Sequence, residues 1–325
     1  MPSTLTLPPV LANTVVILGT GGTIAGAAAS AQDNLGYTAA QRPVADLLAG
    51  LPASAPALAG ITVEAEQVAQ LDSKDMDHAT WQRLLMAVAR HLARPEVAGL
   101  LVTHGTDTLE ETAWLLQRVL APAKPVVLVA AMRPATSMAA DGPQNLLDAL
   151  AVARTPGARG VVAVLAGRVH AAGAVRKLHP YRPDAFGSGE AGPLGLVEEG
   201  VLRRIRDWPT GVPLGVDVLA GDVAGWPWVE IVTSHAGSRG GAVRALVAAG
   251  VQGLVVAATG NGMVHQALAA ALAEAQAAGV TVWRTTRCAE GVLVGADAGP
   301  AAEMSPWQAR VELLLCLLLS ARGGG

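Results

Sequence analysis

Two short segments place hydroxyl side chains directly after apolar runs. The run Val15–Leu18 leads into a glycine-rich turn that carries Thr23, and a second run, Gly99–Thr103, leads to Thr106 and Asp107. A threonine hydroxyl becomes a useful nucleophile only when a neighbouring group accepts its proton or lowers its pKa, so the pair Thr106 and Asp107 is a candidate for such chemistry. Two turns of this kind suggest one shared site.

The elements around these turns predict an α/β fold with a parallel sheet, because short β-branched runs alternate with longer Ala- and Leu-rich stretches. In such sheets ligands bind outside the carboxyl ends of the strands, where both turns are expected. The predicted strands are Val15–Leu18, Ile61–Ala65, Gly99–Thr103, Val126–Ala130, Gly160–Leu165 and Gly253–Ala257. The predicted helices are Val44–Leu51, His78–Ala93, Leu109–Leu120, Gly142–Arg154, Gly241–Ala249 and Met263–Ala277.

Chain length and a break in this alternation predict two domains. A chain of 325 residues exceeds what one compact core usually holds, and the region around residues 187–215 carries turn signals and an arginine cluster. We expect a larger N-terminal α/β domain at residues 1–195, a linker at 196–214 and a smaller C-terminal α/β domain at 215–325. The arginine cluster is interpreted as a solvated face of the linker, with an anion site as the alternative.

The composition indicates small-molecule chemistry. The 23 basic and 26 acidic residues nearly balance, which gives no electrostatic footprint for nucleic acid or an anionic membrane. The two cysteines lack metal-ligand spacing, the N-terminus lacks a signal-peptide pattern, and the longest apolar run is too short to span a bilayer. We expect a cytoplasmic protein, and the low charged fraction of 15% suggests that other subunits cover part of its surface.

The glycine-rich turn has two other interpretations, a plain strand-to-loop turn and a dinucleotide phosphate loop. The phosphate loop requires a third glycine that opens a helix, whereas Ile24 stands at that position and a stretch rich in Ala, Ser and Asn follows. That stretch contains Tyr37, and we interpret it as a lid that closes over Thr23 to exclude water. The ordinary alternative for Tyr37 is a tyrosine packed on a surface loop.

The pair Thr106 and Asp107 needs a cation nearby. Lys177 stands in a polar stretch after the predicted strand Gly160–Leu165 and can supply it. The ordinary alternatives are a solvated lysine and an aspartate that caps the following helix.

Both turns closely resemble the two signature motifs of the bacterial-type L-asparaginase and glutaminase family. The resemblance covers essentially the whole chain and implies an asparaginase-like fold with neither a cofactor nor a metal. It also implies a homotetramer of intimate dimers, in which each active site lies between two subunits. The matching segments are residues 20–26, 104–113, 72–76, 131–143, 192–195, 260–262 and 284–287.

The resemblance implies catalytic roles residue by residue. Thr23 matches the nucleophile at the base of the lid, and Tyr37 matches the lid tyrosine that helps to activate it. Thr106, Asp107 and Lys177 match the second threonine, the aspartate and the lysine of the family's triad.

The same resemblance implies how a substrate binds. Ser73 matches the serine that binds the α-carboxylate, Asp107 also matches the residue that receives the α-ammonium, and the carbonyl of Ala131 matches an acceptor for the amide nitrogen. The implied reaction hydrolyses the side-chain amide of L-asparagine to L-aspartate and ammonia, through attack by Thr23 and an acyl-enzyme. In the rival mechanism Thr106 positions water or attacks in one step.

Three departures from the family's pattern bear on substrate choice. Lys74 stands where many relatives carry Gln or Glu and would repel an α-ammonium by about 1 to 4 kcal/mol at contact, unless it turns to solvent or pairs with Asp75. Met263 replaces a polar residue, and Ala298 replaces a glutamate offered by a neighbouring subunit, with Asp297 beside it. We expect weak affinity for asparagine and little glutaminase activity.

Three alternatives to an L-asparaginase stay open. One is an amidase for a related monoamide whose α-amino group is modified or absent. The others are a catalytically weak amino-acid sensor and an ammonia-generating subunit of a larger amidotransferase. The complete catalytic set argues against a sensor, because binding alone does not require Thr23, Thr106 and Lys177 together.

Overall fold

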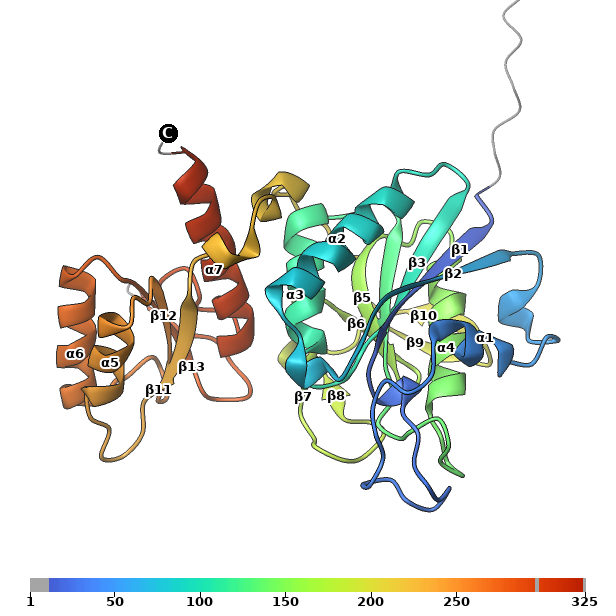
Figure 1. Cartoon of the computed structure of the whole chain (residues 1–325), viewed down its shortest axis with the longest axis horizontal. Helices are drawn as coiled ribbons and strands as arrows, with labels where there is room; N and C mark the ends of the chain where they lie inside the picture. Colours follow the sequence, from blue (N-terminus) through green and yellow to red (C-terminus); the bar gives the residue numbers. More distant parts are fainter. Residues whose placement is uncertain (1–11, 296–297, 324–325) are drawn as a thin grey trace, which may run out of the picture.

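An eight-stranded sheet forms the centre of the N-terminal domain in the computed structural model, which describes residues 12–295 and 298–323. Figure 1 shows this larger domain beside a smaller C-terminal domain. The strand order is β10-β9-β6-β5-β4-β3-β1-β2, and the five strands from β5 to β2 in this order run parallel. The strands are β1 Thr14–Gly21, β2 Thr62–Leu71, β3 Val97–Thr103, β4 Pro125–Val129, β5 Gly160–Leu165, β6 Arg168–Ala171, β9 Gly195–Glu198 and β10 Val201–Arg204.

Helices cover both faces of this sheet, which is why its central strands are apolar on every side. In β1, Val16 and Leu18 pack into a core with α2 and α3, while Val15 and Ile17 pack into a core with α1 and α4. Successive side chains of a strand point to opposite faces, so one strand supplies both cores. The helices are α1 Val44–Ala49, α2 His78–Leu92, α3 Leu109–Leu120 and α4 Gly142–Ala153.

The C-terminal domain is a three-stranded parallel sheet with helices on both faces. Its last helix, α7, also packs against α3 of the N-terminal domain, where Arg118 pairs with the buried Glu312 at 2.8 Å. This contact joins the two domains. The elements are β11 Val229–Thr233, β12 Gly253–Ala258 and β13 Thr281–Thr286, with α5 Gly241–Ala248, α6 Gln266–Ala277 and α7 Pro306–Gly323.

The expected α/β architecture is confirmed, but the predicted linker needs a correction. Residues 196–204 form most of β9 and β10, an antiparallel hairpin at the edge of the large sheet, with Gly200 at a φ of 73° in its turn. The hairpin was missed because an edge strand exposes polar side chains and lacks a continuous apolar run. Arg203 pairs with Glu198 at 3.1 Å on this exposed edge, as expected for a solvated cluster.

Short elements complete the chain. A two-stranded ribbon stands apart from the large sheet, and single turns of 3-10 helix occur in the loops. Within the ranges given above, every helix is too short or too polar to cross a lipid bilayer. The ribbon is β7 Arg176–Lys177 and β8 Phe186–Gly187, and the 3-10 turns are η1 Thr23–Ala25, η2 Pro56–Leu58, η3 Ser73–Asp75, η4 Gly189–Ala191, η5 Val216–Leu219 and η6 Val223–Gly225.

Candidate active site

The two hydroxyl-bearing turns touch each other at the carboxyl edge of the large sheet. Their strands, β1 and β3, are parallel neighbours, with Gly19 paired to Thr103. A Cβ atom on Gly22 would lie 2.4 Å from the Cα of Gly105, and Gly22 has a φ of 81°. Only glycine satisfies both conditions, since the conformation is left-handed and the space is filled by the other turn. Strand order therefore brings the two motifs into one site.

Thr23 is held in the first turn with its hydroxyl against a tyrosine. Thr23 begins η1 and is buried, and its Oγ1 lies 2.8 Å from the hydroxyl of Tyr37. Tyr37 comes from residues 26–38, which we call the Tyr37 loop. Either hydroxyl can donate this hydrogen bond, so Tyr37 is placed to accept the proton of Thr23.

Lys177 contacts two side chains of the second turn, those of Thr106 and Asp107. The Nζ of Lys177 donates to Thr106 Oγ1 at 2.8 Å and to Asp107 Oδ1 at 2.6 Å. The lysine is half-buried on β7, whose pairing with β8 sets its direction. The structure thus places the Lys177 ammonium within hydrogen-bond distance of both Thr106 and Asp107.

Ser73 brings a third segment to the same place. Its buried Oγ accepts a hydrogen bond from the backbone N–H of Asp107 at 3.1 Å, and its carbonyl accepts one from the Thr108 hydroxyl at 2.8 Å. A Cβ atom on Gly105 would lie 2.3 Å from Ser73 Oγ, so this approach also requires glycine. Ser73 and the second turn therefore form one connected unit.

Ala131 comes two residues after β4, the strand next to β3, and is fully buried. The backbone on both sides of it is held in place. The carbonyl of Ala130 accepts a hydrogen bond from Asn145 at 2.8 Å, and the carboxylate of Asp141 accepts one from the N–H of Met132 at 2.9 Å. These contacts fix the direction of the Ala131 carbonyl.

The positive charge of Lys74 is balanced by two neighbouring carboxylates. Its Nζ lies 2.5 Å from Asp75 Oδ2 and 3.6 Å from Asp72 Oδ2, and the Asp75 hydrogen bond raises the pKa of the Lys74 ammonium. Of the two interpretations of Lys74, the structure has the one in which it pairs with Asp75. We therefore expect Lys74 to repel a substrate ammonium less strongly than an unpaired lysine would.

The other two departures belong to the C-terminal domain. Met263 follows β12 with an exposed side chain, and its backbone pairs with Thr259 in both directions at 2.8 and 2.9 Å. Ala298 lies on the loop between β13 and α7, while Asp297 lies outside the described residues. The catalytic candidates above all come from the N-terminal domain.

His104 is a residue of this site that the sequence interpretation passed over. It is fully buried, with Nε2 2.9 Å from Thr112 Oγ1 and Nδ1 2.7 Å from the carbonyl of Gly105. Thr112 Oγ1 also accepts from the indole N–H of Trp81 at 2.9 Å. A carbonyl oxygen only accepts, so Nδ1 carries the imidazole proton, and in the neutral ring Nε2 accepts the proton of Thr112.

This assignment makes His104 a neutral anchor for the turn. Burial lowers the pKa of His104 to about 4, so the ring stays uncharged at neutral pH. Its Nδ1–H then donates to the carbonyl of Gly105, directly before Thr106. The position inside the second motif was a signal that could have identified it.

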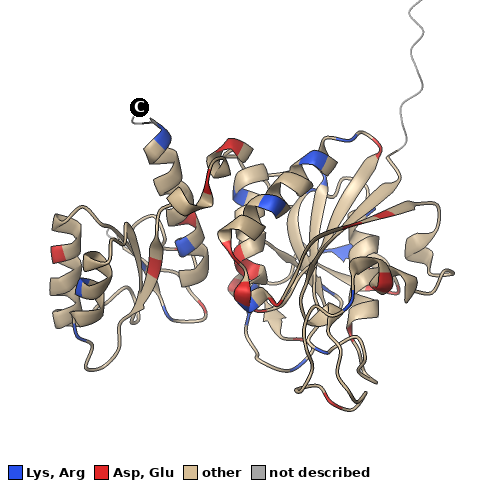
Figure 2. Cartoon of the chain, viewed as in Figure 1, with Lys and Arg blue, Asp and Glu red and all other residues tan. Residues whose placement is uncertain are grey.

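Acidic positions gather where α3 begins, as Figure 2 shows. Burial, with a smaller contribution from Glu111, raises the pKa of Glu110 to about 7, and Arg176 and Lys177 oppose the shift. Glu110 and Lys177 line one pocket of about 340 Å³ between the domains. Sequence alone did not reveal this carboxyl group, because its burial depends on the packing of the C-terminal domain.

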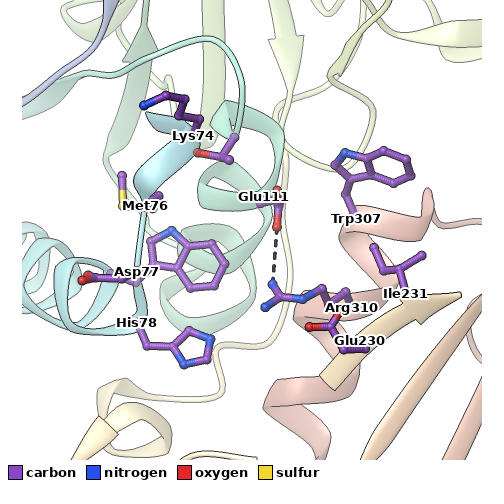
Figure 3. Close-up of a pocket in the computed structure, with 11 residues that line it drawn as sticks. Lys74, Met76, Asp77, His78, Glu111, Glu230, Ile231, Trp307 and Arg310 are labelled. Atoms are coloured by element: carbon purple, nitrogen blue, oxygen red, sulfur yellow. Dashed lines mark ion pairs between the residues drawn. The ribbon is translucent and has the colours of Figure 1, made fainter. Parts of the chain in front are cut away.

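A second pocket between the domains has a volume of about 540 Å³. Glu111 and Arg310 face each other across it as an ion pair at 3.5 Å, and Lys74 stands at its upper rim in Figure 3. In the described part of the chain, no group of three or more His, Cys, Asp or Glu side chains has the arrangement of a metal site.

Comparisons with known proteins agree along nearly the whole chain. Residues 14–209 match the family description "Asparaginase, N-terminal", and residues 228–322 match "Glutaminase/Asparaginase C-terminal domain". A glutaminase-asparaginase from Pseudomonas fluorescens biotype A is 36% identical over 94% of this chain and 86% of its own length. L-asparaginase 2 from Bacillus subtilis is 34% identical over 93% of this chain and 81% of its own length.

A solved structure shows the same fold. The crystal structure of a probable cytoplasmic L-asparaginase from Campylobacter jejuni matches with a TM-score of 0.87 and 34% identity, over 94% of this chain and 95% of that one. Fold, sequence and grouped hydroxyls together define an amidohydrolase. The chain belongs to the asparaginase family.

Proposed function

We propose that this protein hydrolyses the side-chain amide of L-asparagine to L-aspartate and ammonia, with Thr23 as the nucleophile. The observation that carries the proposal is a pair of threonine hydroxyls on touching turns. Thr23 is hydrogen-bonded to Tyr37, and Thr106 is hydrogen-bonded to Lys177. The named relatives, which are L-asparaginases and glutaminase-asparaginases, support the same reaction.

The chemistry is an acyl transfer in two steps. Tyr37 accepts the proton of Thr23 as the Thr23 oxygen attacks the amide carbon, and it passes its own hydroxyl proton on to the amide nitrogen, while backbone N–H groups stabilise the oxyanion. The bond from carbon to nitrogen breaks when nitrogen takes up a proton and leaves as ammonia. Water then attacks the ester, with Thr106 and Lys177 transferring its proton, which releases aspartate and restores Thr23. In the alternative Thr106 positions or delivers the nucleophile in one step.

For the substrate, we propose that Ser73 binds the α-carboxylate, Asp107 the α-ammonium and the Ala131 carbonyl the amide nitrogen. The ion pair between Lys74 and Asp75 supports this assignment, because it leaves less uncompensated charge to repel the ammonium. The expectation of weak affinity then depends on Met263 and Ala298 rather than on Lys74. A monoamide without an α-amino group remains the second candidate substrate.

We also propose a homotetramer in the cytoplasm, in which a neighbouring subunit completes each site with Met263 and Ala298. The similarity to the probable cytoplasmic enzyme of Campylobacter jejuni supports this location, although a relative in Haemophilus influenzae is named as periplasmic. Light scattering of the purified protein tests the assembly, and a monomer that is fully active would contradict it.

Ammonia release from L-asparagine, L-glutamine, D-asparagine and succinamic acid tests the function. We expect turnover of L-asparagine that disappears in Thr23→Ala. Activity on succinamic acid alone would identify the monoamide as the substrate. Binding of asparagine without turnover of any of the four compounds would favour the sensor.

A further inference from the structure

The Tyr37 loop runs beside the segment that follows β4, residues 131–141, which we call the β4 segment. In Figure 1 the Tyr37 loop is the dark blue loop at the lower end of the N-terminal domain, next to the green β4 segment. Four hydrogen bonds join them. These are Ala135 N–H to the Gly26 carbonyl, Ala28 N–H to Thr136 Oγ1 and Met138 N–H to the Ala31 carbonyl, each at 2.9 Å, and Ser137 Oγ to Asn34 Oδ1 at 2.6 Å.

The β4 segment is a rigid partner in this contact. The carboxylate of Asp141 accepts hydrogen bonds from the backbone N–H groups of Met132 and Arg133, at 2.9 and 3.0 Å. The Ser137 hydroxyl is itself preorganised, since its oxygen accepts from the N–H of Ala139 at 3.2 Å. Ser137 therefore presents its proton in a direction that the segment sets in advance.

The Tyr37 loop, in contrast, is tied mainly to itself. Ala27 and Thr38 pair through two backbone hydrogen bonds of 2.9 Å, which close the loop at its base. Inside it, Asp33 Oδ1 accepts from the N–H groups of Leu35 and Gly36 at 2.9 and 2.7 Å. Apart from the backbone contacts next to its two ends, the Tyr37 loop makes five hydrogen bonds to the rest of the described chain. These are the four bonds to the β4 segment and the bond from Tyr37 to Thr23.

We propose that Ser137 and Asn34 are positioning residues for the amide hydrolysis proposed above, because their hydrogen bond holds the Tyr37 loop closed and so keeps Tyr37 on Thr23. Theirs is the only bond of the four that joins two side chains, and Asn34 lies three residues from Tyr37. The effect on reaction rate rests on the proposed function, whereas the effect on the loop does not.

The position of Ala131 gives this contact a second consequence. Ala131 begins the β4 segment, and Asp141 holds the backbone directly after it. A substrate amide bound by the Ala131 carbonyl and a closed Tyr37 loop then use the same rigid segment. Substrate binding and loop closure are thereby coupled through the β4 segment.

Hydrogen–deuterium exchange of the full-length protein without substrate tests the effect on the loop. We expect Ser137→Ala to speed exchange of the amides in residues 27–38 by roughly fivefold, as loss of one partly buried hydrogen bond does. Ser137→Thr, which keeps a hydroxyl, should restore slow exchange. Ser30→Ala is the matched control, because the Ser30 hydroxyl accepts only from Gln32 N–H inside the loop. Unchanged exchange in Ser137→Ala would overturn the proposal.

Steady-state kinetics with L-asparagine test the effect on the reaction. We expect kcat/KM to fall roughly fivefold in Ser137→Ala. In the Tyr37→Phe background the same substitution should cause no further loss, since Ser137 acts through Tyr37. Losses that multiply would overturn the positioning role. If Ser137→Ala loosens the loop but the wild-type protein hydrolyses no amide, the proposed function is refuted and the contact between loop and segment still stands.

Discussion

The two threonines of the site are held in different ways. The turn with Thr106 rests on a buried chain of hydrogen bonds through His104, and Lys177 and Ser73 contact the turn from two other segments. Thr23 is equally buried, but its partner Tyr37 comes from a loop whose tip is exposed, with Leu35 78% accessible. One half of the site is built in advance, and the other half is complete only while a loop stays in place.

In the proposed mechanism, this difference lets the site admit substrate and then exclude water. In the proposed binding mode the rigid half holds the α-carboxylate and α-ammonium before chemistry begins, because Ser73 and Asp107 are joined by a hydrogen bond. The loop half places Tyr37, the residue that we propose activates Thr23. Substitutions on the rigid side should therefore affect folding and activity together, whereas those on the loop side should affect activity alone.

Removing the nucleophile should have the largest effect. Thr23→Ala deletes the oxygen that we propose forms the acyl-enzyme, so we expect ammonia release from L-asparagine to fall at least about a thousandfold with little change in stability. Thr38→Ala is the matched control, since its exposed side chain lies in the same loop region. Near-normal turnover in Thr23→Ala would instead assign the nucleophilic role to Thr106.

Removing the cation of the rigid half should come next. Lys177→Met leaves Thr106 and Asp107 without the group that bonds to both, so we expect kcat to fall by about a hundredfold to ten-thousandfold. Binding of L-aspartate, measured by calorimetry, should weaken far less than kcat falls. Equal losses in binding and turnover would mean that Lys177 only holds the site together.

Adding a side chain at Gly22, where the two turns touch, should push the two halves of the site apart. Gly22→Ala places a methyl group against Gly105 at a left-handed φ, so we expect a loss of about 4 kcal/mol in the free energy of unfolding. Gly60→Ala is the matched control, because Gly60 has a similar φ of 72° but no atom within 4 Å of the added carbon. Urea denaturation measures both, and equal losses would show that backbone strain alone is responsible.

Glu110 should make the rigid half sensitive to pH. Its pKa is raised to about 7 in the folded protein, so the unfolded chain loses this proton at lower pH than the folded chain does. The free energy of unfolding should therefore fall by about 3 kcal/mol as pH rises from 4.5 to 7. Glu110→Gln removes this contribution and should gain stability relative to wild type across that window. Parallel curves for the two proteins would contradict the burial of this charge.

Lys74→Gln should have the smallest effect. Because Lys74 is exposed and paired with Asp75, we expect its loss to change the KM for L-asparagine by less than about fivefold. A much lower KM in Lys74→Gln would show that the ion pair opens and that Lys74 repels the substrate. High salt should then produce the same change in wild type.

The sequence predicted best those strands whose side chains are buried on both faces of the sheet. β1, β3, β4 and β5 read as continuous apolar runs because helices cover both faces of the sheet, and α3 was predicted from residue 109 to residue 120 as observed. The element α7 was missed, because it packs between α3 and the C-terminal sheet and carries apolar side chains around most of its circumference. β11 and β13 were missed because charged or polar residues interrupt them.

The chemistry of the site could also be predicted from its residue types. Hydroxyls and a carboxylate in the two motifs, with a lysine elsewhere in the chain, predicted nucleophilic catalysis, and glycine predicted close approach, because these properties belong to single residues. Which groups meet was decided only by the tertiary structure. Lys177 reaches Thr106 across 71 positions and Ser137 reaches Asn34 across 103, and such contacts depend on strand order and packing, which no local pattern records.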